Sequence, residues 1–265
     1  MPTEKPIIWA AAIAVLAGAA ALYYYFHSHE SAPAPPPPQL RLPPPPPPPA
    51  QPAIANPLPS NPAPAAKPLP SLSDSDALVH DSLVALPGAA ALEKFLVPQM
   101  LVRHIVVTID NLPRKKVAVE QRPIKSTSGQ FVTRGDADSL TMSTQNFARY
   151  APFIELVKGT DAHQLVQLYR QYYPLFQQAY EDLGYPGQYF NDRVVQVIDD
   201  LLATPDVPGP VALTQPNVMF LYADPKLEAR SAGQKTLIRM GSENESLIKQ
   251  KLQQIRAEIA LKKAA

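Results

Sequence analysis

Acidic side chains are the first residues here that could do chemistry, because two carboxylates facing one cleft can hydrolyse a glycosidic bond. One of the two groups must have a raised pKa. Asp199 and Asp200 are neighbours on a predicted helix, where adjacent side chains point about 100° apart. We therefore expect capping or solvated roles, not an acid–base pair. The same holds for the other acids considered: Glu155, Glu181, Asp182, Asp192 and Asp224.

Two short motifs resemble nucleophile and phosphate sites, but each lacks a necessary part. Ser246 and Lys249 fit S-x-x-K, yet they lie in a polar amphipathic helix with no K-T-G motif to accompany them. Gly233 and Lys235 resemble the end of a phosphate loop, but Gln234 separates them and the upstream glycine is missing. The sequence predicts no catalytic residue here.

Metal ligands are few. The chain has no cysteine, which removes thiolate ligands, thiol nucleophiles and disulfides. His80, His104 and His163 fit no H-E-x-x-H motif and have no acidic or histidine partner at a metal-binding helical spacing. We expect no metal site and no cofactor.

A basic segment is the first of two groups that point to binding. Residues 113–141 form a predicted polar loop or hairpin with few acids, and such a segment could contact anionic lipid headgroups or wall polymers. An ordinary solvated loop is the favoured explanation, because most runs of charge are solvated. The cations are Arg114, Lys115, Lys116, Arg122, Lys125 and Arg134.

Tyrosines make up the second group, since the ring offers apolar area and the hydroxyl a hydrogen bond. Their spacing fits a groove or a packed helical core. They are Tyr169, Tyr172, Tyr173, Tyr180, Tyr185 and Tyr189. A ligand or partner surface would join such rings to cationic side chains. The residues we expect on it are Arg149, Arg170, Tyr173, Arg193, Lys235 and Arg239.

Helical periodicity dominates after the proline-rich region. A helix capped near Ser73 and another opening at Pro98 are predicted, followed by one that begins near Ser143 and bends at Pro152. Asp161 should cap the strongest helix, which Pro174 should kink.

The remaining segments complete a mainly α domain with a minor β-hairpin. A helix is predicted at 189–202, a hairpin within 211–223 and a helix at 231–240. Gly241 should break the chain before a last helix capped by Ser242. That helix carries a 4-3-4 seam suited to an oligomer or to packing within the chain: Ile248, Leu252, Ile255 and Ile259.

The N-terminal part predicts a membrane anchor. Residues 7–26 contain no charge and would span roughly 30 Å as a helix, with Trp9 at one end and aromatics at the other. A cleaved signal peptide, with Ala19 and Ala21 at the cleavage site, is the alternative. Lys5 precedes the span, which favours a cytoplasmic tail at 1–6 and a periplasmic remainder.

A stalk is predicted between the anchor and the domain. Nineteen of the 33 prolines lie between Pro33 and Pro70, a composition that excludes helix and sheet. We expect residues 27–70 to be a disordered spacer that could reach about 100 Å when extended. Recognition of its PxxP segments by a partner is the alternative. The globular domain would occupy 71–265.

Several stretches of the domain resemble a bacterial family known as domain of unknown function 3014. They include TIDNLPR at 108–114, LYRQYYPLFQQAYEDLGYP at 168–186 and the GQK-x-L-x-RM-G stretch at 233–241. The resemblance covers 71–261 and implies an N-terminal span, a proline-rich linker and this domain. It implies no activity, ligand or catalytic residue.

These features favour a binding role. The chain's net charge is only +1, which argues against a nucleic-acid partner. We expect a single-pass inner-membrane protein whose periplasmic domain is a binding or scaffold module for an envelope protein or the cell wall. A wall-acting hydrolase with an unrecognised site is the alternative.

Overall fold

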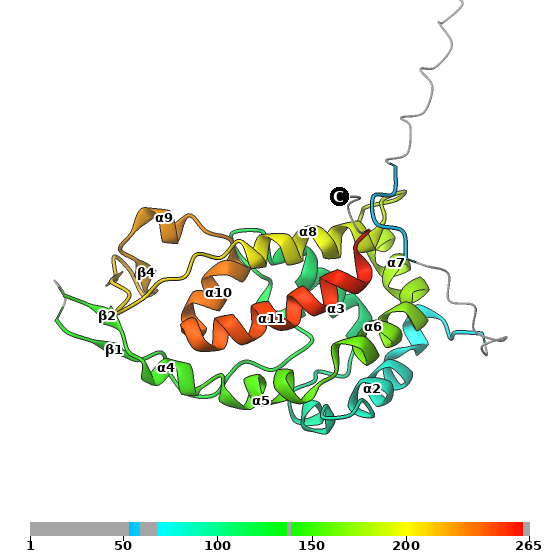
Figure 1. Ribbon diagram of the computed structural model, residues 1–265, viewed down its shortest axis with the longest axis horizontal. Coiled ribbons are helices and arrows are strands. Elements are labelled where there is room, and N and C mark those ends of the chain that lie inside the picture. The colour runs from blue at the N-terminus through cyan, green and yellow to red at the C-terminus, as the bar shows by residue number, and fades with distance from the viewer. Residues whose placement is uncertain (1–52, 59–67, 137–138, 262–265) are drawn as a thin grey trace, which may run out of the picture. The chain divides into compact units, whose positions relative to one another are not determined.

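The computed structural model describes residues 53–58, 68–136 and 139–261, which form a mainly helical domain with small two-stranded hairpins (Figure 1). The predicted span at 7–26 and most of the predicted stalk lie outside these residues. Within the described ranges, no helix combines the length and apolarity that crossing a bilayer requires.

The carboxylate of Asp76 links the first two α-helices of the domain through hydrogen bonds. A 3-10 turn, η1 (Leu72–Asp74), precedes α2 (Asp76–Val84), and η2 (Ala90–Lys94) leads to α3 (Leu101–Asn111). Asp76 accepts hydrogen bonds from the backbone N–H groups of Met100 (2.7 Å) and Leu101 (2.8 Å). These bonds satisfy donors that a helix start leaves free. The helix therefore begins at Leu101 and not at Pro98.

Prolines start helices in this domain where the sequence predicted bends. The chain forms α4 (Gln145–Ala148) and α5 (Ala151–Gly159), and then α6 (Ala162–Gln171) and α7 (Tyr173–Asp182). Pro152 and Pro174 lie in the first turns of α5 and α7. The backbone N–H groups in the first turn of a helix have no carbonyl partner within the helix. A proline there therefore breaks no backbone hydrogen bond. Asp161 caps α6 as predicted, with Oδ1 2.8 Å from Gln164 N.

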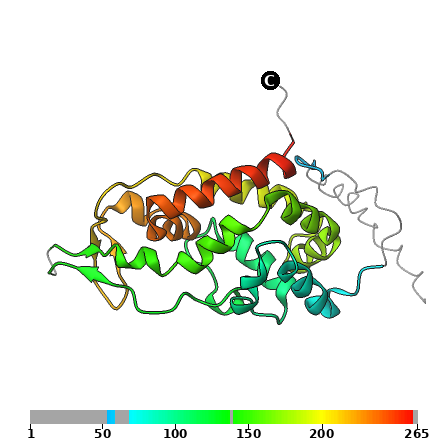
Figure 2. The same ribbon diagram turned by 60° about the horizontal axis from the view of Figure 1, so that its bottom comes forward.

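Of the C-terminal helices, α8 (Phe190–Leu202), α10 (Ala232–Met240) and α11 (Ser242–Ile259) follow the predicted order, whereas the short α9 (Pro225–Glu228) was not predicted. Ser231 caps α10 by accepting a bond from Gln234 N. Ser242 does not cap α11, because Gly241 occupies the N-cap position with φ 85°. In both views α11 runs beside α8 (Figures 1 and 2).

Two antiparallel hairpins lie together at one end of the domain (Figure 1). β1 (Thr133–Arg134) pairs with β2 (Thr141–Met142), and β3 (Leu213–Thr214) pairs with β4 (Leu221–Tyr222). The second hairpin confirms the one predicted at 211–223. The β1–β2 hairpin agrees with one of the two predictions for residues 113–141, a polar loop or a hairpin. An isolated β-bridge between Thr141 and Ala212 connects the two hairpins.

Candidate functional site

Arg149 is held by a loop. Its guanidinium donates to the carbonyls of Ser128 (3.1 Å) and Gly129 (3.0 Å), and to the hydroxyl of Thr127 (3.3 Å). These bonds tie residues 127–129, in the middle of the basic segment, to the end of α4. Arg149 therefore has a structural role here, because its hydrogen bonds hold residues 127–129 in place.

Arg193 belongs to a charged cluster between α3 and α8. Its Nε lies 2.9 Å from Oδ1 of Asp110, a residue only 3% exposed, while Arg114 Nη2 lies 2.6 Å from Oδ2. The hydroxyl of Tyr185 donates to the same carboxylate (3.2 Å). The charge of Asp110 raises the pKa of Arg114. Two cations thus share one buried acid, so the charge of this acid is paired and does not lie buried alone.

Lys235 and Arg239 come together around Tyr222. Lys235 Nζ lies 2.7 Å from Glu228 Oε1, and the Arg239 guanidinium carbon lies 5.8 Å from the Tyr222 ring centre. Burial raises the pKa of the Tyr222 hydroxyl to about 12, partly offset by Arg239. Burial also acts to raise the pKa of Glu228, but bonds from Lys235 and from Tyr222 N outweigh it and lower that pKa.

Arg170 and Tyr173 flank the junction of α6 and α7. Arg170 donates to the carbonyl of Glu258 near the end of α11 (2.8 Å). Tyr173 donates to Gln177 (2.9 Å) and accepts from Asn191 N (3.2 Å). Burial is the main cause that raises the pKa of the Tyr173 hydroxyl. Of the six predicted surface residues, only Lys235 and Arg239 share a neighbour in these contacts.

The candidate acids also have structural partners. Asp199 pairs with Arg256 (2.5 Å), Asp200 accepts from Ser231 Oγ (2.7 Å), and Asp224 caps α9. These contacts agree with the predicted capping and solvated roles. Within the described ranges, no group of three or more acidic, histidine or cysteine side chains is placed to hold a metal ion.

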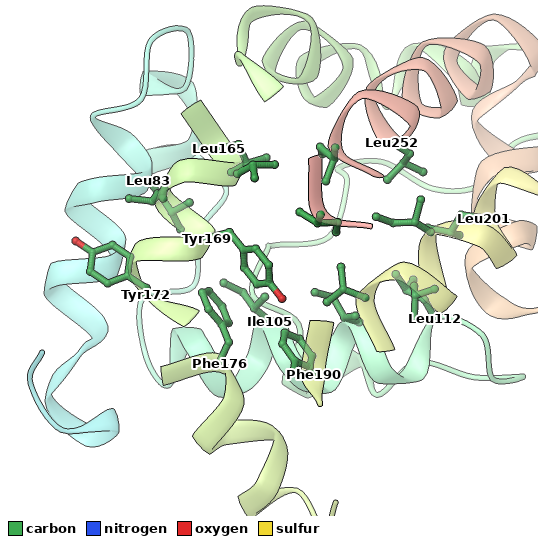
Figure 3. Close-up of a pocket in the computed structure, with 18 of the residues that line it drawn as sticks. Leu83, Ile105, Leu112, Leu165, Tyr169, Tyr172, Phe176, Phe190, Leu201 and Leu252 are labelled. Carbon is green, nitrogen blue, oxygen red and sulfur yellow. The ribbon is translucent and has the colours of Figure 1, made fainter. Parts of the chain in front are cut away.

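A pocket of about 480 Å³ beside the hairpins has a partly polar lining, which includes Arg134, Glu243 and Glu245. A second pocket, inside the helical bundle, is almost wholly apolar and has a volume of about 300 Å³. Ligand sites start at about this size. Figure 3 shows side chains from α2, α3, α6, α7, α8 and α11 that converge on the same space. The stripes that line it are Ile105, Ile109 and Leu112; Leu165, Leu168, Tyr169 and Tyr172; Val194, Val197, Ile198 and Leu201; and Leu252, Ile255 and Ile259.

The wall of this pocket is almost wholly carbon. Its two hydroxyl-bearing side chains use their oxygens elsewhere: Tyr169 donates to Asn191 Oδ1 (3.3 Å), and Tyr172 shares a hydrogen bond with Ser82 Oγ (2.7 Å). In Figure 3 the Tyr172 hydroxyl points away from the centre of the pocket. Such a wall offers no acid, base or oxyanion donor to a substrate. It can bind an apolar group and exclude water.

A ligand that fills the pocket would remove its apolar wall from water, which favours binding of an apolar group.

Periodicity predicted apolar helix faces here, and it left open whether the tyrosines line a groove or pack in the core. Periodicity shows which face of a helix points inward, not how far its neighbours stand away. On α3, Val102 and Val106 are fully buried, while Ile105 and Ile109 face the pocket and stay half-buried. Nothing in their residue types separates the two pairs.

Comparison with known proteins gives one match. A family model described as "Protein of unknown function (DUF3014)" matches residues 101–256, from the start of α3 through most of α11. No curated protein matches the chain. No solved structure matches it either.

Proposed function

This chain belongs to the DUF3014 family of proteins of unknown function, and we propose that it is a membrane-tethered binding module whose helical domain holds the hydrocarbon chain of a membrane lipid. The observation that carries the proposal is the pocket of about 300 Å³ with an almost entirely carbon wall. All its lining residues except Val79, Leu83 and Ile259 fall inside the matched range.

The size of the pocket selects the ligand class. About 300 Å³ holds roughly ten groups of water size, at about 30 Å³ each. A chain of about ten carbons fits, and each buried methylene contributes about 0.8 kcal/mol before the costs of binding. A charged headgroup finds no partner on this wall, so it stays outside the pocket.

A lipid is the favoured occupant because of the predicted topology. The uncharged run at 7–26 would anchor the chain in the inner membrane, and the proline-rich residues 27–70 would tether the domain on the periplasmic side. Acyl chains are then the most abundant apolar ligands within reach. A scaffold role toward envelope proteins is compatible with the same tether.

A wall-acting hydrolase has less support. Such an enzyme needs a cleft with convergent carboxylates or an activated nucleophile. Asp199, Asp200 and Asp224 are bonded to an arginine, a serine and a helix start, and the pocket wall offers no proton donor. Binding is the function that this geometry supports best.

Photolabelling tests the proposal. The full chain is reconstituted in vesicles that contain decanoic acid with a diazirine on its chain, irradiated, and digested for peptide mass spectrometry. We expect adducts on peptides of α6, α8 and α11. Ile105→Trp, which fills the pocket, should lower their yield by about tenfold, since much of the burial is lost.

A matched substitution provides the control. Val218 is 86% exposed on the β3–β4 hairpin, so Val218→Trp adds the same ring far from the pocket wall and should leave labelling unchanged. Adducts confined to residues 7–26, or equal labelling of Ile105→Trp and wild type, would refute lipid binding by the pocket.

A further inference from the structure

A short segment ahead of the domain is bonded to one end of the bundle. Residues 55–58, here called the strap, lie within the range predicted as stalk. The backbone N–H groups of Ala55 and Asn56 donate to the Asp192 carboxylate at 2.9 and 2.6 Å, and Leu58 N donates to the Tyr189 hydroxyl at 3.1 Å. Bonds to an ionised acceptor are among the stronger ones in proteins.

Asn56 ties the strap to the end of α11. Its side-chain oxygen accepts from Leu261 N (3.1 Å), and its amide nitrogen donates to Asp192 (3.1 Å). Both Figures 1 and 2 show this segment beside the last turn of α11. One side chain thus joins the start of α8 to the residues that follow α11.

Asn191 carries the connection into the pocket wall. This fully buried amide donates to the carbonyls of Asn56 (2.8 Å) and Ile259 (2.9 Å), and its oxygen accepts from the Tyr169 hydroxyl (3.3 Å). Ile259 and Tyr169 both line the pocket. Asn191 therefore connects the strap to two residues of the pocket wall.

Leu58 adds an apolar contact at the same end. It is half-buried and packs against the cluster of Val166, Val195, Ile198 and Ile259, three of which line the pocket. The exposed strap residues Ala55 and Pro57 alternate with the inward Asn56 and Leu58. The chain bends at Ala55 and Asn56, and this bend turns the Asn56 and Leu58 side chains toward the bundle.

We propose that the strap is a latch that controls lipid entry to the pocket, an inference that rests on the function proposed above. With the strap seated, Asn56 and Leu58 hold the last turn of α11 against α6 and α8. With the strap released, Ile259 loses this support and the end of the pocket opens. The strap precedes the domain on the side of the predicted anchor, so tension along the chain would reach it first.

The test measures the rate of decanoic acid diazirine labelling of the pocket peptides in the full-chain protein in vesicles. Asn56→Ala should raise that rate by about tenfold, the scale expected when the two side-chain hydrogen bonds to Leu261 and Asp192 are lost. It should also speed amide hydrogen exchange at Leu261, whose N–H loses its acceptor. Ile54→Ala, a change at an exposed neighbour, should alter neither rate.

A reversible lock gives the opposite change. The chain has no cysteine, so Asn56→Cys with Leu261→Cys introduces the only two thiols. Oxidation should slow labelling of the pocket, and reduction should restore it.

The outcomes separate the two proposals. Labelling in the wild type with no change in Asn56→Ala would overturn the latch and leave lipid binding standing, and so would unchanged exchange at Leu261. Absence of pocket labelling in every variant would overturn lipid binding and the latch together.

Discussion

Two valines of the bundle have the same chemistry and different surroundings. Val106 is fully buried in packed core, while Val194 faces the apolar pocket. In a close-packed interior an added ring forces strain, whereas in a void it finds contacts. The sign of a valine-to-phenylalanine change therefore reports whether the space beside each residue is filled.

Val194→Phe should stabilise the ligand-free domain by about 1 kcal/mol, as cavity-filling changes commonly do. Val106→Phe should destabilise it by about 1–3 kcal/mol through overpacking. Urea unfolding of the full-chain protein measures both. If Val194→Phe destabilises as much as Val106→Phe, the pocket is not an available volume.

Tyr222 gives a prediction about alkaline stability. Burial raises the pKa of its hydroxyl to about 12, above the unfolded value of about 10. The unfolded state therefore loses this proton first. The stabilisation is fully present below about pH 10 and is lost as pH rises toward about 12.

Tyr222→Phe should flatten this alkaline loss. It should also cost about 1 kcal/mol at neutral pH, because the hydroxyl donates to the Lys235 carbonyl at 3.0 Å. Unfolding at a series of pH values tests the slope, and the difference in tyrosinate absorbance between variant and wild type follows the one group. A variant with the wild-type slope would show that Tyr222 ionises normally.

At the scale of elements, Gly241 sets the corner between α10 and α11. Its φ of 85° disfavours any side chain, and an added Cβ would lie 2.8 Å from Phe147 Cδ2. Gly209 has a similar φ of 81° but open space around the added atom. The two glycines therefore separate backbone strain from collision.

Gly209→Ala should cost about 1 kcal/mol from the left-handed backbone alone. Gly241→Ala should cost about 2–4 kcal/mol, because strain and the ring contact combine. Thermal unfolding of the two full-chain variants gives the comparison. Equal costs would mean that the α10–α11 corner has more room than the packing on Phe147 indicates.

Much of the helical plan was predictable because it depends on local chemistry. Asp161 caps α6 and Gly241 interrupts the chain between α10 and α11, both as predicted. Pro152 and Pro174 were misjudged because a proline in a first turn and one inside a helix look alike in sequence. The start of α3 was missed because its cap, Asp76, comes from another helix.

The candidate site was less predictable. Periodicity predicted apolar helix faces, but it does not show how far apart the packed helices hold those faces. The six expected surface residues were chosen for charge and aromaticity, and buried partners such as Asp110 and Asn191 engage Arg193 and Tyr173. The spacing of residues along the sequence does not reveal long-range partners of this kind.

The whole molecule, as we propose it, combines a membrane anchor, a stalk and a domain with an apolar pocket. Residues 7–26 and 27–70 would keep the domain within about 100 Å of the bilayer that supplies the ligand. The strap, residues 55–58, lies within the predicted stalk, in its C-terminal half. Its bonds to Asp192 and Asn191 link any pull on the tether to the pocket wall.

The most direct test of the central claim is magnetic resonance contact between ligand and pocket. The full chain, with labelled isoleucine methyl groups, is placed in deuterated lipid discs with protonated decanoic acid. If the pocket holds the acyl chain, we expect nuclear Overhauser contacts from the chain methylenes to Ile105, Ile198 and Ile255, which line the pocket. We expect none to Ile124, which does not line it. Contacts confined to isoleucines of residues 7–26 would contradict it.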